Sequence, residues 1–74
     1  MELTQLKKDE KAKVLSIEGG CGITRKLEMM GITPGVEITK TSSQYMRGPV
    51  IVSVRRTEVA IGYGMARRII VEPL

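Results

Sequence analysis

The chain has 74 residues, and its Lys and Arg outnumber Asp and Glu by 12 to 8, which gives a formal net charge of +4. This length predicts a single domain, residues 1–74, with a small core. With one cysteine, Cys21, and no histidine, the composition excludes an intramolecular disulfide and a Cys/His zinc site. The N-terminal residues lack the apolar stretch of a secretory signal, and no aliphatic run approaches the roughly 20 residues that cross a bilayer. We therefore expect a cytoplasmic protein.

The first predicted strand is Lys11–Ile17. Ala12 and Val14 alternate with charged residues, which is typical of a strand with one buried face. Over residues 15–17 the alternation shifts by one position, and such a shift predicts a β-bulge or a strong local twist.

A helix is predicted next, over about residues 22–31. Ile23, Leu27 and Met30 recur at i, i+4 and i+7, so they form one apolar stripe that packs against the rest of the molecule. A glycine directly after this stripe favours the left-handed conformation that ends a helix, and the Thr-Pro-Gly sequence that follows predicts a turn. The residues assigned to structural turns are Gly22, Gly31, Pro34 and Gly35.

The second half of the chain reads as short strands. Residues 36–40 alternate apolar and polar side chains, residues 41–49 form a long loop, and Val50–Val54 returns with its valines on one face. A short turn over residues 55–58 leads to a strand at 59–61. One helical turn at 65–68 then precedes the last strand, residues 69–72, whose pairing Pro73 is expected to end.

The predicted fold class is mostly β. Five short strands, one inserted helix and one helical turn can form a small five-stranded β-barrel, and closure of a barrel removes most exposed strand edges.

The sequence offers no catalytic group, so we expect a protein that is not an enzyme. Cys21 has no histidine partner and no activating base near it in sequence. The glycines around it do not form a phosphate-binding P-loop, because the lysine of that motif is missing. The glutamates are dispersed, so no metal site and no cofactor are predicted, although weak binding of Fe(II) or another divalent ion stays open.

Nucleic acid is not expected as a partner. Single-stranded nucleic acid and proline-rich peptides both need aromatic platforms, and the chain has two tyrosines with no Trp or Phe. Contact with phosphates through the arginines at 55, 56, 67 and 68 remains the alternative.

A protein-binding surface fits the composition better. Met29 lies beside Arg25 and near Lys26 on the predicted helix, and methionine and arginine are both suited to interfaces. The competing interpretation is that Met29 only widens the buried stripe. A second group of interface-favoured residues lies in the long loop. Together the candidate partner-binding residues are Arg25, Lys26, Met29, Tyr45, Met46 and Arg47.

Several of these motifs together resemble the FeoA family of small ferrous iron transport proteins. The most specific are the opening Leu-Thr-Gln-Leu-Lys at residues 3–7, the helix with its Met-Gly-Ile-Thr-Pro-Gly break at residues 30–35, and the ending at residues 66–71. The chain departs from common members at Cys21 and at residues 56–58.

The resemblance implies an SH3-like β-barrel with one added helix. It also implies a non-catalytic, cytoplasmic accessory protein that binds the cytosolic part of FeoB, the Fe(II) permease with a GTP-binding domain, and modulates its activity or assembly. Such a protein is peripheral to the membrane through its partner only, and a monomer is expected. The alternative is a small iron-responsive regulatory or metal-binding domain, because related domains form the C-terminal part of DtxR-type repressors.

Overall fold

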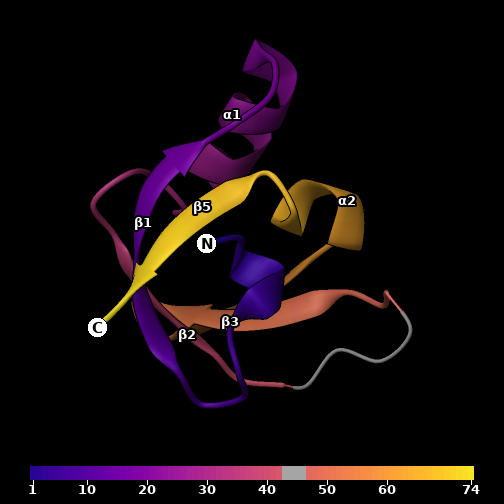
Figure 1. Ribbon diagram of the computed structural model, residues 1–74. Coiled ribbons are helices and arrows are strands. Elements are labelled where there is room, and N and C mark those ends of the chain that lie inside the picture. The colour runs from indigo at the N-terminus through magenta and orange to yellow at the C-terminus, as the bar shows by residue number, and fades with distance from the viewer. Residues whose placement is uncertain (43–46) are drawn as a thin grey trace.

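The computed structural model describes residues 1–42 and 47–74. Within them, five strands form one antiparallel sheet in the order β4-β3-β2-β1-β5 (Figure 1). The strands are β1 (Lys11–Ile17), β2 (Glu37–Lys40), β3 (Val50–Val54), β4 (Thr57–Ile61) and β5 (Ile69–Pro73). The helical elements are the 3₁₀ helix η1 (Leu3–Gln5) and the α-helices α1 (Cys21–Met29) and α2 (Tyr63–Ala66).

The core lies on the concave side of this strongly curved sheet. Val50, Val52 and Val54 are all buried, as their alternation in the sequence predicts. From the other elements, Leu3 of η1 and Leu27 of α1 are fully buried and belong to the same apolar cluster. The mostly β, barrel-like architecture expected from the sequence is therefore confirmed.

Among residues 1–42 and 47–74, strand pairing does not close the barrel, since β4 and β5 stand at opposite ends of the strand order. The N-terminal residues cover part of the β5 edge. The Met1 ammonium donates to the Val71 carbonyl oxygen at 3.0 Å, Val71 N–H donates to Met1 O at 2.7 Å, and Glu2 forms an isolated bridge with Ile70. The N-terminus therefore pairs with a strand about 70 residues away in the sequence.

Local details agree with the sequence in part. The register between β1 and β5 shifts between Val14 and Ser16, which confirms the predicted bulge. Pro73 does not end the pairing before it, because it is the last paired residue of β5, opposite Ala12. A proline is tolerated at such a strand end, where its missing N–H is not needed.

Several boundaries differ from the predictions. α1 begins at Cys21 and ends at Met29, whereas the sequence predicted about 22–31, because the residues after Met29 form the cap rather than another turn. The turn predicted over residues 55–58 has only two residues, Arg55 and Arg56, and β4 starts directly after them. The second helix begins at Tyr63 and not at residue 65.

Candidate functional site

Helix α1 stands at one end of the molecule, beyond the sheet (Figure 1). Its N-terminal side is joined to the sheet where Glu18 N–H donates to the Arg68 carbonyl oxygen at 2.7 Å. Gly19 follows with φ +119°, and a Cβ there would lie 3.2 Å from both Arg68 Cδ and Ile23 Cδ1. The backbone angle at this position therefore favours glycine, and a larger residue would also force Arg68 and Ile23 to shift by a few tenths of an ångström.

The C-terminal side of α1 ends in a Schellman motif. Gly31 N–H donates to Glu28 O and Ile32 N–H donates to Leu27 O, each at 2.9 Å. Gly31 has φ +84°, which is the left-handed conformation that this motif needs. Ile32 and Leu27 are both fully buried, so the cap also directs the chain back into the core.

A tight turn then starts β2. Val36 N–H donates to Thr33 O at 3.1 Å, and Gly35 has φ +95°. Residues 33–36 therefore form a type II turn with Pro34 at its second position. Gly35 N–H donates to Val14 O at 2.8 Å, and this bond joins the end of the segment that contains α1 to β1. Gly22 is placed differently from the other predicted turn glycines, because it lies inside α1 and a Cβ there would meet nothing within 4 Å.

The outward surface of α1 carries the first group of candidate residues. Leu27 is fully buried while Met29 is 84% exposed, and Arg25 and Lys26 are exposed too. The interpretation that Met29 widens the buried stripe is therefore wrong. We call Arg25, Lys26 and Met29 the α1 outer face: a flexible apolar side chain on a positively charged helix surface, which is suited to contact with a protein.

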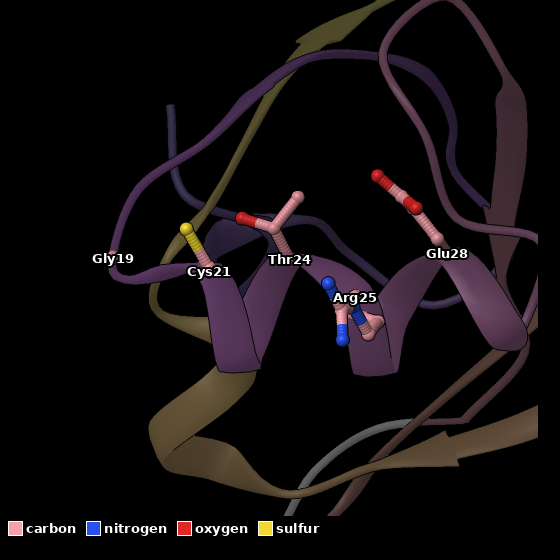
Figure 2. Close-up of a pocket in the computed structure, with 5 residues that line it drawn as sticks. All are labelled: Gly19, Cys21, Thr24, Arg25 and Glu28. Atoms are coloured by element: carbon pink, nitrogen blue, oxygen red, sulfur yellow. The ribbon is translucent and has the colours of Figure 1, made fainter.

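Next to this surface, α1 lines a shallow groove of about 300 Å³. Cys21, Thr24 and Glu28 project from one side of the helix, with Arg25 on the side facing the viewer in Figure 2. Gly19 completes the lining. The groove contains an exposed thiol, a hydroxyl, a carboxylate and a guanidinium, and all but Gly19 come from the same helix.

A second groove, of about 360 Å³, lies where α2 meets β5 and the N-terminus. Arg67 Nε approaches Glu2 Oε1 at 4.0 Å, the longest distance that still counts as an ion pair, and the Arg67 side chain is 61% exposed, so this pair contributes little to stability. Glu18, Gly64 and Arg68 complete its lining.

The second group of candidate residues is only partly described. Tyr45 and Met46 lie outside the described residues. Arg47 is exposed with φ 64°, and it belongs to the segment that leads into β3 rather than to α1. The described part of the chain therefore brings together Arg25, Lys26 and Met29, and places Arg47 on a different connection.

In residues 1–42 and 47–74, no three His, Cys, Asp or Glu side chains gather where they could hold a metal ion. Over the same residues, no helix is long and apolar enough to span a bilayer.

Lys40 is a feature that the sequence analysis missed. Its side chain is buried, and its ammonium donates to the carbonyl oxygens of Leu6 at 2.7 Å and Thr4 at 3.4 Å. Burial lowers the pKa of Lys40, and the charge of Glu10 opposes this shift in part. A signal was present in the sequence, because Lys40 shares the inward face of its strand with Ile38.

Known proteins resemble this chain over almost its whole length. The chain is 39% identical over 66 residues to a Methanocaldococcus jannaschii protein that bears the name Fe(2+) transport protein A. The match covers 89% of this chain and 78% of that protein. A crystal structure of the iron uptake regulatory protein FeoA is 38% identical, with a TM-score of 0.90 over 100% of this chain and 96% of the other.

Two further structures extend the comparison. A FeoA-like protein from Clostridium acetobutylicum is 28% identical, with a TM-score of 0.87 over 100% of this chain and 86% of that one. A manganese-dependent transcriptional repressor is 19% identical, with a TM-score of 0.91 over 100% of this chain and 41% of the repressor, a likeness that shows the SH3-like fold alone. The family model described as the FeoA domain matches residues 1–73, and the chain therefore belongs to the FeoA domain family.

Proposed function

We propose that this protein is a non-catalytic accessory protein of ferrous iron uptake. In this proposal it binds the cytosolic part of a FeoB-type Fe(II) permease, modulates the activity or assembly of that permease, and reaches the membrane only through it. The family assignment supports the link to Fe(2+) transport. The contact surface that we propose on this protein is the α1 outer face.

The observation that carries this choice is the exposure of Met29, at 84% of its surface. A large apolar side chain left in water on a helix gains free energy when a partner covers it, and methionine adapts its shape to the surface it meets. Arg25 and Lys26 beside it are also exposed, and they supply charge-assisted hydrogen bonds to an acidic partner. The permease surface that meets α1 should therefore combine an apolar pocket with Asp or Glu at its rim.

Binding is tested by NMR titration of the labelled protein with the GTP-binding domain of the permease and with the full-length permease in nanodiscs, each with and without nucleotide. We expect amide shifts concentrated on α1. We further expect Met29→Ser to weaken binding by about tenfold, near 1.4 kcal/mol, which is a moderate interface contribution.

Leu74→Ser is the matched control, since Leu74 is another large apolar side chain, 68% exposed, and lies at the other end of the chain. Its affinity should equal that of the unmodified protein. Unchanged spectra with every form of the permease would disprove the proposal, whereas binding that Met29→Ser and Leu74→Ser affect equally would disprove only the choice of the α1 outer face.

The alternative, a metal-binding or regulatory domain, has less support. The likeness to the manganese-dependent repressor concerns the fold, and the described residues contain no cluster of metal-ligating side chains. No specific observation in the described residues favours that function over contact with a permease.

A further inference from the structure

The two edge strands of the sheet, β4 and β5, differ in whether other main chain covers them. The N-terminal residues hydrogen bond along β5, as described above. The outer edge of β4 has no such cover, since among the described residues the only main-chain partner of this strand is β3. An uncovered edge presents N–H and C=O groups that can pair with another strand.

The register of the β3–β4 hairpin identifies which groups face outward. The two-residue turn makes Val54 and Thr57 a hydrogen-bonded pair, and hydrogen-bonded pairs recur at every second position along an antiparallel ladder. Glu58 and Ala60 occupy the positions between them, so their N–H and C=O groups point away from β3. The bond from Thr41 N–H to Ile51 O, at 2.9 Å, agrees with this alternation, because it shows that the residue opposite Ala60 turns its carbonyl toward β2.

Strand β4 lacks several of the features that prevent edge pairing. It contains no lysine, no proline and no bulge, and its pairing with β3 runs from Thr57 to Ile61 without a shift in register, although Glu58 is charged. By contrast, the β1–β5 pair contains a bulge and ends at Pro73. The edge of β4 is therefore regular and open to another strand.

We propose that the β4 edge pairs with the β4 edge of a second copy of this chain, antiparallel and around a two-fold axis at Val59. This register places Glu58 of each copy opposite Ala60 of the other. Since both residues direct their N–H and C=O groups outward, the two strands can exchange four hydrogen bonds. Self-pairing of this kind is isologous, as expected for a two-fold dimer.

Side chains on the outer face are compatible with this pairing. Glu58 meets the small Ala60 rather than a like charge. The two Glu58 side chains become diagonal neighbours at about 7–8 Å. Their repulsion is limited because Thr41 Oγ1 donates to Glu58 Oε2 at 3.0 Å, which holds the carboxylate over β2 and away from the edge.

Such an interface is small. A five-residue edge buries much less than the roughly 1,200–2,000 Å² of a stable complex, so the dimer forms at high protein concentration and dissociates on dilution. This inference is independent of the proposed contact with the permease, which uses α1.

Sedimentation equilibrium and NMR dilution spectra of the full chain test the pairing. As concentration rises, the mean mass should increase toward that of two chains, and the amide signals of Glu58 and Ala60 should shift. Ala60→Pro should abolish the association, since it removes an outward N–H and leaves the hydrogen bonds to β3 intact. Ala60→Thr, which keeps the N–H, is the matched control and should still dimerise.

A pair of charged variants tests the register without removing a hydrogen bond. Ala60→Lys places a positive charge opposite Glu58 of the second copy, whereas Ala60→Glu places a like charge there. With two symmetric pairs per dimer, we expect the dissociation constants of these variants to differ by roughly tenfold, with Ala60→Lys the tighter, and the difference to shrink in high salt.

A mass that stays at one chain up to the solubility limit would overturn the proposal. So would a dimer that survives Ala60→Pro, or charged variants that associate equally. An extended peptide from another protein that shifts Glu58 and Ala60, with no self-association in its absence, would assign the edge to a different occupant and would also refute self-pairing.

Discussion

At the scale of single residues, Lys40 connects the N-terminal segment to the sheet. Its ammonium donates to the carbonyl oxygen of Leu6, at the end of η1, and to that of Thr4 within it. Cationic side chains suit the unpaired carbonyl groups at the end of a helical turn. The same burial disfavours the charged form, and for this reason the pKa of Lys40 is lowered from its ordinary value of 10.5.

This lowered pKa predicts a pH dependence of stability. Between the folded-state pKa and 10.5, the unfolded chain binds more protons at Lys40 than the folded chain does, so the free energy of unfolding rises with pH. Relative to Lys40→Met, the unmodified protein should therefore gain stability from pH 8 to pH 10.5, with a slope of at most about 1.4 kcal/mol per pH unit. Urea denaturation of both proteins at several pH values measures this gain.

Lys11→Met, at an exposed position of β1, controls for the simple loss of one positive charge. If the difference in unfolding free energy between the unmodified protein and Lys40→Met stays flat or falls over this pH range, the lowered pKa is wrong.

Whether a side chain is buried depends on both its residue type and its position in the element, and for two residues these two indications disagree. Lys40 has the same period-two placement as the buried Ile38, but charged side chains are rarely fully buried, so it was not assigned to the interior. Met29 shows the opposite balance. Its apolar type alone fits the core, but its place on the helical wheel beside Arg25 favoured the surface, and it is 84% exposed.

At the scale of elements, the β3–β4 hairpin holds two arginines in an unfavourable conformation. Arg55 has φ 50° and Arg56 has φ 68°, which gives the left-handed type I′ turn that fits the twist of the flanking strands. Asparagine and glycine adopt this conformation at low cost, whereas arginine does not.

Replacing the turn with Arg55→Asn and Arg56→Gly should therefore stabilise the protein. We expect a gain of about 1–2 kcal/mol, with Tm rising by about 4–8 °C for each kcal/mol. Thermal unfolding followed by circular dichroism measures the change. The control, Arg55→Lys with Arg56→Lys, keeps both charges and the strained backbone angles and should leave Tm unchanged. An equal gain in both double variants would show that the backbone conformation is not the cause.

Elements with a strong period were predicted well. The bounds of β1 and β3 match the prediction, because Ala12 and Val14 of β1 and the three valines of β3 recur at every second position. The turn after β3 was predicted too long, since Arg-Arg is not a typical turn sequence and Thr57 and Glu58 are polar enough to resemble a loop. Pairing with β3, rather than local sequence, extends β4 to Thr57.

At the scale of the whole molecule, the N-terminal segment completes the core. Leu3 is fully buried in the same cluster as Val71 and Ile69 of β5, while the main chain of Met1 pairs with Val71. A domain of this size has a stability of only about 4–11 kcal/mol, so each large core side chain carries an appreciable share.

Leu3→Ala should cost about 2–5 kcal/mol, through lost burial and the cavity left behind. Leu15→Ala is the matched control, because Leu15 is 47% exposed and its truncation should cost less than about 1 kcal/mol. Urea unfolding curves of the two variants measure both effects. Equal losses would indicate that η1 does not contribute to the core as described.

Local sequence patterns do not determine which edges of the sheet are covered. A closed barrel was expected to remove the edges, but closure depends on whether the first and last strands of the order meet, and local patterns do not report this. The contact that protects β5 joins residues 1 and 71, and no periodic signal marks it. The exposed edge of β4 follows from the same gap in the strand order.

The way α1 is inserted has a consequence for how this protein diverges from its relatives. Both ends of the helix are held by main-chain hydrogen bonds, at Glu18 to Arg68 and at Gly35 to Val14, while Arg25, Lys26 and Met29 face solvent. Substitutions confined to that surface should leave the barrel undisturbed, whereas Leu27 on the inward side of α1 is held in the core. If the α1 outer face binds the partner as proposed, partner preference can evolve there independently of the scaffold.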